Sequence, residues 1–134
     1  MFDELKKYKS QGHFFFNPDS DLKKVCNAPK KGIGVFYILE LSKGKIRIVY
    51  IGSEGTVENN GDINSYGLYD HIVNGKEFNS WNEKLKKEGI DALDVYWFET
   101  FDKENQDSPT YVKALIMQSY LHLQGELPKW NKEF

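Results

Sequence analysis

Four acidic side chains between residues 54 and 70 have types and spacing that could do chemistry. Glu54, Glu58, Asp62 and Asp70 lie in and after a polar segment rich in glycine and asparagine, which predicts a loop. Carboxylates on such a loop can converge on a hard cation such as Mg²⁺, which prefers oxygen ligands. The alternative is an ordinary solvated loop, and we favour that interpretation.

A lysine-rich stretch from Trp81 to Lys87 could contact phosphates. Its charged positions alternate with Trp81 and Leu85, a pattern typical of a surface helix with one apolar side. The acidic residues Glu83 and Glu88 dilute the positive charge. The stretch therefore reads as ordinary helix surface rather than as a phosphate-binding patch.

The charge balance excludes a strong overall attraction to polyanions. The chain carries 18 Lys and Arg against 20 Asp and Glu, a formal charge of −2. Arg47 is the only arginine, and arginine is the residue best shaped for bidentate contacts to phosphate and guanine. We expect a nucleic-acid partner such as DNA to be bound weakly and through a local patch, with another protein as the alternative partner.

Cysteine usage and hydropathy indicate the compartment. Cys26 is the only cysteine, so it cannot form an intramolecular disulfide, and no charged-then-apolar leader opens the sequence. No stretch approaches 18 consecutive apolar residues. These features predict a soluble, cytoplasmic protein without a membrane partner.

Apolar and β-branched runs predict three strands. The segments Val35–Leu41 and Ile46–Gly52 flank a turn at residues 42–45, which predicts an antiparallel hairpin. Leu93–Thr100 predicts a third strand in the same sheet. Between and after them, helices are expected at about 68–74, 80–87 and 109–123, with Asn79 or Ser80 as the N-cap of the second.

The order of these elements predicts one compact domain. Residues 1–32 are expected to form an N-terminal helical lead-in, and residues 33–134 the main body. The fold class is α/β or α+β, with a small, mostly antiparallel, three-stranded sheet flanked by helices.

Four segments, in this order, resemble the GIY-YIG nuclease superfamily. They are GVFYI at 34–38, YIG at 50–52, GLYDHI at 67–72, and a closing stretch from Leu115 to a Pro-x-x-Asn end at Asn131. The resemblance implies the GIY-YIG fold. It also implies a magnesium-dependent DNA endonuclease, in which a metal-bound carboxylate holds the scissile phosphate, tyrosine and histidine activate water, and arginine stabilises the transition state.

Several positions of the family's catalytic set are replaced in this chain. Tyr50 and His71 keep the places of a tyrosine and the histidine. Phe36 stands where the first tyrosine is expected and lacks its hydroxyl. Gly67 stands in the arginine's place, and Val112 in that of the metal-binding glutamate, so no metal or other cofactor is expected.

The resemblance further implies that Phe36, Tyr50 and His71 converge on one concave face, with a gap at Gly67. Tyr37 is expected on the opposite side of the sheet, because successive strand residues alternate. Without a function, Tyr50 would simply pack by its ring, and His71 would hydrogen-bond a carbonyl. The further candidate binding positions are Arg47, Ser53, Tyr69 and Asn131.

Three hypotheses remain open at this point. The favoured one is a catalytically impaired GIY-YIG domain that binds nucleic acid or protein. The second is an active endonuclease that holds Mg²⁺ at a relocated acidic site among residues 54–70. The third is a structural or oligomer-forming domain without nucleic-acid contact, and the sequence leaves the question of enzymatic activity undecided.

Overall fold

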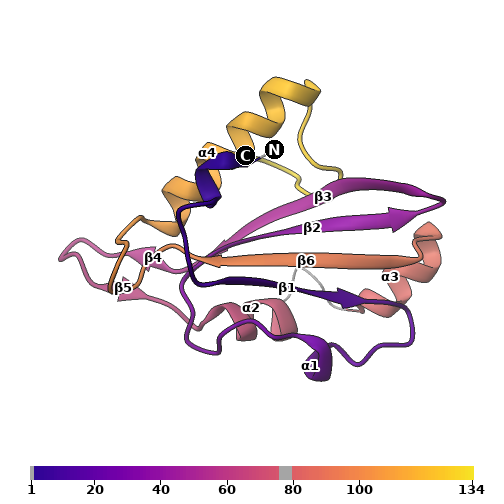
Figure 1. Ribbon diagram of the computed structural model, residues 1–134, viewed down its shortest axis with the longest axis horizontal. Helices are drawn as coiled ribbons and strands as arrows, with labels where there is room; N and C mark the ends of the chain where they lie inside the picture. The colour runs from indigo at the N-terminus through magenta and orange to yellow at the C-terminus, as the bar shows by residue number, and fades with distance from the viewer. Residues whose placement is uncertain (1, 76–79) are drawn as a thin grey trace.

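The computed structural model of the chain describes residues 2–75 and 80–134. Within them an antiparallel sheet lies between two layers of helices (Figure 1). In chain order the elements are η1 (Asp3–Leu5), β1 (Gln11–Phe16), α1 (Leu22–Val25), β2 (Gly34–Ser42), β3 (Lys45–Glu54), β4 (Thr56–Val57), β5 (Ile63–Asn64), α2 (Leu68–Asn74), α3 (Trp81–Glu88), β6 (Ala92–Glu99) and α4 (Pro109–Gln124).

The main sheet has four strands in the order β1-β6-β2-β3. The three predicted strands are confirmed as β2, β3 and β6, but the prediction of a three-stranded sheet was wrong. Strand β1 pairs with β6 and alternates exposed His13 and Phe15 with buried Phe14 and Phe16. The segment before residue 33 is therefore not simply a helical lead-in, since it supplies an edge strand.

A glycine explains why β1 escaped prediction. Gly12 lies opposite Trp97, and a Cβ at Gly12 would come within 2.7 Å of the indole ring. A residue that usually weakens strands is therefore required here to make room for a neighbouring side chain.

The predicted β2-β3 hairpin is confirmed, and it contains a bulge that the sequence did not reveal. The turn residues Lys43 and Gly44 both have positive φ, as two-residue hairpin turns require. Further along, Ile38 pairs with Tyr50 but Leu39 pairs with Ile48, so Val49 is an extra residue on β3. The bulge reverses the alternation of β3, so that Tyr50 faces the side of the sheet covered by α2.

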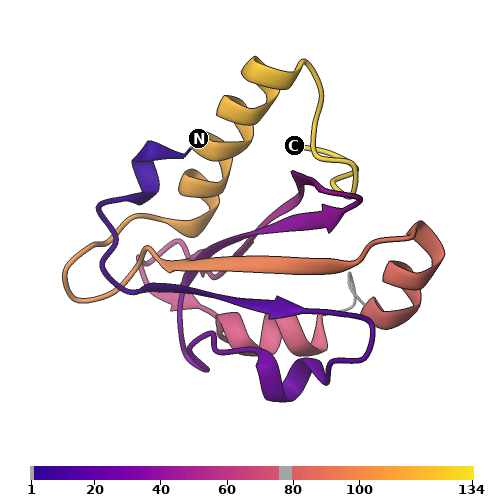
Figure 2. The ribbon, with the colours of Figure 1, turned by 45° about the vertical axis from the view of Figure 1, so that its right-hand side comes forward.

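Each face of the sheet has its own core. Helices α1, α2 and α3 cover one face, and η1 and α4 cover the other (Figures 1 and 2). The first core includes Phe36, Ile38, Tyr50, Leu68, Ile72, Trp81 and Leu85. The second includes Phe2, Leu5, Val35, Ile51, Phe98, Val112, Ile116 and Met117, which confirms that the helix at residues 109–124 packs on the sheet.

Two local predictions need correction. The segment from Ser53 to Gly61 is not wholly irregular, because β3 runs to Glu54 and β4 then pairs with β5 in a separate ribbon. Helix α3 begins after Ser80, whose φ is 66° and whose side chain makes no capping hydrogen bond; Asn79, the other predicted cap, lies outside the described residues.

Candidate functional site

The side chains of Phe36, Tyr50 and His71 meet on the α2 side of the sheet. The ring centroid of Phe36 lies 5.9 Å from that of Tyr50 and 5.4 Å from that of His71. The predicted convergence on one face is thus confirmed, and it depends on the β3 bulge. Tyr37 lies on the opposite face, as expected, where its ring stacks on Tyr96.

Two of these three side chains, those of Phe36 and Tyr50, are buried in the protein core. The exposed fraction is 0% for Phe36 and 8% for Tyr50, whereas the His71 side chain is 22% exposed. His71 is therefore the member through which this group can meet a solvent-borne molecule.

A buried carboxylate, which the sequence suggested only as part of an acidic metal site, holds His71. Glu54 is 7% exposed, and its Oε1 lies 2.9 Å from Nδ1 of His71. Its Oε2 accepts hydrogen bonds from the Ser65 hydroxyl and the Tyr66 backbone N–H, both at 2.8 Å. Because a charged carboxylate can only accept, the ring nitrogen donates, and this fixes the orientation of the imidazole.

The pKa of Glu54 reflects these contacts. Burial raises the pKa, but the hydrogen bonds from His71, the Tyr66 N–H and Ser65 together lower it by more, so the pKa lies below the ordinary value of 4.5. The sequence did contain a signal for this partner. Glu54 lies two and four residues after Gly52 and Tyr50, and the period of a strand puts all three on one face.

The four acidic residues considered as a relocated metal site do not gather. Asp62 accepts a hydrogen bond from Asn60 in the β4-β5 ribbon, and Asp70 accepts one from Asn74 on α2. Glu58, in the turn of that ribbon, is exposed. Residues 2–75 and 80–134 contain no group of three or more His, Cys, Asp or Glu side chains that could hold a metal ion.

Gly67 does not leave the predicted gap. It precedes the first residue of α2 with φ of 95°, and a Cβ there would lie 1.7 Å from the backbone oxygen of Lys30. The neighbouring N–H of Leu68 donates to the carbonyl of Gly32 at 2.8 Å. Close backbone contact and a left-handed conformation therefore require glycine here, so an arginine could not occupy this position without moving the chain.

Val112 lies away from the group around His71. It is 1% exposed and packs with Val35 and Ile51 in the core under α4, on the other side of the sheet. A carboxylate at this position would therefore not reach the face that carries Phe36 and His71.

Three of the candidate binding positions have structural partners elsewhere. Arg47 pairs with the buried carboxylate of Glu40 at 3.3 Å. The Asn131 side chain bonds both the N–H and the carbonyl of Ile51, at 2.9 and 3.0 Å. Ser53 is a β3 residue opposite Val35 in the hairpin. None of these contacts involves His71.

The fourth position, Tyr69 on α2, lies among lysines. Its hydroxyl donates to the backbone oxygen of Lys23 at 2.9 Å, its backbone N–H bonds the carbonyl of Pro29, and the Lys30 ammonium lies 5.8 Å from its ring. The exposed lysines on this side form what we call the basic cluster: Lys23, Lys24, Lys30 and Lys31.

The basic cluster is a local excess of positive charge. No Asp or Glu occurs between residues 22 and 39, and none of its four ammonium groups forms an ion pair with a carboxylate of the described residues. By contrast, Lys84 of α3 pairs with Glu88 at 3.8 Å. The paired lysines at 23–24 and 30–31 are the sequence signal for this cluster, whereas from the sequence only the lysines of α3 were considered.

Comparisons with known proteins give no family for the chain. No protein-family model, curated protein or solved structure matches it. Among the described residues, no helix has both the length and the apolar character needed to span a membrane.

Proposed function

We propose that this chain is a GIY-YIG-like domain that has lost hydrolysis and binds nucleic acid weakly through the basic cluster. The observation that carries the proposal is the group of exposed lysines around Tyr69. Tyr69 lies on α2, the helix that also carries His71. Tyr66, which is 81% exposed and lies two residues before α2, adds an aromatic ring on which a base could stack.

The chemistry of the site supports binding rather than cleavage. Phe36 has no hydroxyl to move a proton, and the backbone at Gly67 excludes the arginine that the resemblance would put there. The Glu54 carboxylate, which pairs with His71, already accepts hydrogen bonds from three donors. Phosphoryl transfer needs preorganised positive charge at the scissile group, and these residues do not supply it.

Lysine is suited to the proposed mode of recognition. Its ammonium group attracts phosphate as a point charge, without the bidentate geometry by which arginine reads guanine. We therefore expect binding with little sequence preference. Binding that neutralises up to four phosphates should weaken with added salt, with a slope of log K against log salt of at most about −3 to −4.

The experiment is a titration of labelled 20-nucleotide single-stranded and duplex DNA, followed by fluorescence anisotropy at several salt concentrations. Replacement of all four lysines of the basic cluster by Gln should reduce affinity at low salt at least tenfold and flatten the salt dependence. The matched control replaces Lys84, Lys86 and Lys87 of α3 by Gln and should leave binding unchanged. Equal binding by the natural chain and the cluster variant would refute the proposal.

One observation favours a second candidate, an active endonuclease. The Glu54 carboxylate fixes His71 as a general base would need to be fixed. In this alternative, the ligands of Mg²⁺ would have to come from residues other than Glu54 and His71. If neither DNA binding nor cleavage is found, the remaining reading is a protein-binding or oligomer-forming domain, for which sedimentation of the purified chain is the first measurement.

A further inference from the structure

A ladder of stacked rings crosses the sheet on the face opposite to the basic cluster. The rings of His13 on β1 and Tyr96 on β6 lie 4.7 Å apart and nearly parallel, with an interplanar angle of 8°. The next step, from Tyr96 to Tyr37 on β2, measures 5.1 Å and 10°. Phe98 also stacks on Tyr37, at 5.9 Å and 21°.

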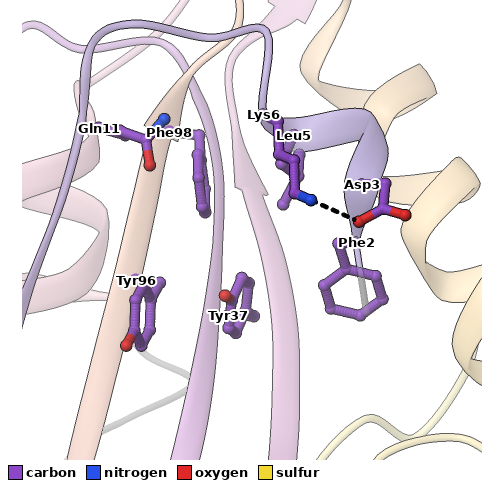
Figure 3. A pocket seen from close by; sticks show the side chains of 8 residues that line it. All are labelled: Phe2, Asp3, Leu5, Lys6, Gln11, Tyr37, Tyr96 and Phe98. Carbon is purple, nitrogen blue, oxygen red and sulfur yellow. Dashed lines mark ion pairs between the residues drawn. The ribbon is translucent and has the colours of Figure 1, made fainter.

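A groove of about 300 Å³ lies between this ladder and η1. Figure 3 shows Tyr96 next to Tyr37, Phe98 further along the strand of Tyr96, and Phe2 and η1 on the other side of Tyr37. The residues that line the groove are Phe2, Asp3, Leu5, Lys6, Gln11, Tyr37, Tyr96 and Phe98. Its volume is at the lower end of the range of about 300–1,000 Å³ that is usual for small-molecule sites.

Phe2 shows how a ring packs on the ladder. Its ring meets Tyr37 edge to face, at 5.3 Å and 70°. This arrangement brings the positive edge of one ring to the negative face of another. The ring of the adjacent Tyr96 already stacks on His13 and on Tyr37, so a flat ligand in the groove could make this kind of contact by placing its own face against the edge of Tyr96.

The polar groups of the groove suit an uncharged ligand that carries hydrogen-bonding groups. Gln11 donates from its side-chain nitrogen to the backbone oxygen of Tyr8 at 2.6 Å, which fixes the amide and leaves its oxygen as an acceptor on the side of Phe98 (Figure 3). The only two charged residues in the lining, Asp3 and Lys6, form an ion pair at 3.1 Å.

Among the described residues, the lysines in and around the groove have carboxylate partners. The nearby lysines of the same segment are paired, Lys7 with Asp107 at 2.9 Å and Lys9 with Glu104 at 3.9 Å. A nucleotide or a nucleic-acid strand would therefore gain less electrostatic attraction from these paired lysines than from the basic cluster.

We propose that this groove binds a free, uncharged heteroaromatic molecule of nucleoside size, with its ring against Tyr96 and an N–H of its edge donating to the Gln11 oxygen. The proposal is independent of the proposed function, because the sheet separates the groove from the basic cluster. The two sites share no residue, so either can fail alone.

The test uses adenosine as the probe, with binding followed by NMR chemical-shift changes of the protein amides. The natural chain should bind adenosine with a Kd on the order of 0.1–1 mM, the affinity that an ordinary ligand efficiency gives a molecule of this size. The shifts should map to residues 2–11, 37 and 96–98. Tyr96→Leu should weaken binding at least tenfold, and Gln11→Met severalfold.

Matched controls distinguish the groove from nonspecific stacking. Phe15→Leu removes a 56% exposed ring from the same face but outside the groove lining, and it should leave adenosine binding unchanged. Thermal unfolding of each variant confirms that it is folded; Gln11→Met changes an exposed residue and keeps the test valid if Tyr96→Leu does not fold. The proposal is overturned if adenosine causes no saturable shifts up to 10 mM, taken as about tenfold above the weakest expected Kd, or if Gln11→Met binds like the natural chain. It is also overturned if adenosine monophosphate binds this groove more tightly than adenosine, because an uncharged ligand would then be the wrong class.

Discussion

At the scale of single residues, Gly67 and Glu54 show how far a side chain's role depends on its surroundings. The resemblance to the GIY-YIG superfamily would make Gly67 the replacement of an arginine. In the fold it is a residue with φ of 95° whose Cα lies against the Lys30 backbone. The backbone conformation and the close approach of Lys30, rather than the loss of a function, are the physical reason for glycine at this position.

Gly67→Ala should therefore be strongly destabilising. The new methyl group would have to move the Lys30 carbonyl, and the backbone would stay in a left-handed conformation, so we expect a loss of about 2–4 kcal/mol in the free energy of unfolding. The matched control is Gly61→Ala, since Gly61 has φ of 86° but open space around it. It should lose about 1–2 kcal/mol, the cost of the conformation alone. Urea denaturation of the two variants measures the difference, and equal losses would show that the contact with Lys30 is unimportant.

Glu54 should make the fold sensitive to acid. Its pKa in the folded chain lies below the ordinary value of 4.5, so its charged form stabilises the fold above that value. This contribution is lost as the pH falls from 4.5 through the lower folded pKa. Glu54→Gln should remove that part of the pH dependence, so the stability difference between the natural chain and the variant should shrink on acidification. Urea denaturation between pH 7 and pH 3 checks this, and a difference that stays constant would contradict it.

At the scale of elements, the C-terminal tail protects the free edge of β3. The backbone N–H of Trp130 donates to the carbonyl of Val49 at 2.9 Å, and the Asn131 side chain bonds both backbone groups of Ile51. These contacts occupy the backbone groups of an edge strand, which would otherwise be available to another chain. They also hold β3 next to its bulge, and thereby the position of Tyr50.

Asn131→Ala should loosen this edge. It would leave the backbone groups of Ile51 without their partners, at a cost of about 1–3 kcal/mol in the free energy of unfolding. Hydrogen exchange at the Ile51 amide should become faster, while that at Ile38, within the sheet, should follow only global stability. Asn60→Ala, which removes two exposed hydrogen bonds to Asp62 in the ribbon turn, is the control and should change stability by less than about 0.5 kcal/mol. Unchanged protection at Ile51 would show that the tail does not hold the edge.

The elements also show what the sequence could and could not predict. Long apolar runs with clear turns gave β2, β3 and β6, and the amphipathic pattern at residues 109–123 gave α4, because these signals are local. Strand β1 was missed because Gly12 is explained only by Trp97, far away in the sequence. The bulge at Val49 was missed for the same reason, since it appears only when β2 and β3 are paired.

For the candidate site, too, contacts between distant segments could not be predicted from local sequence signals. Convergence of Phe36 and His71 could be expected from a resemblance in segment order, whereas the partnership of Glu54 with His71 required the end of β3 to be known. The lack of space at Gly67 depends on the Lys30 backbone, which lies in a different segment. Contacts between segments are what the single sequence did not contain.

At the scale of the whole molecule, the sheet separates two faces with different chemistry. One face carries His71 and the basic cluster, and the other carries the aromatic groove and the buried Val112. A change on one face should have little effect on binding at the other, because no described ion pair or side-chain hydrogen bond links the two groups of residues. This separation also bears on whether the catalytic groups that the resemblance implies could be introduced by substitution.

We expect the natural chain to show no cleavage of supercoiled plasmid or single-stranded DNA with Mg²⁺ or Mn²⁺, since loss of one preorganised charge or donor typically costs about 10²–10³ in rate. Such losses are not additive, so no total rate follows from them. Val112→Glu should not restore cleavage, because the new carboxylate would lie under α4 with the sheet between it and His71. As an unpaired buried charge it should instead destabilise the fold by about 3–5 kcal/mol, which thermal unfolding would detect. Robust metal-dependent cleavage by the natural chain, abolished in His71→Ala but retained in His122→Ala on the distant helix α4, would show that the endonuclease alternative is correct.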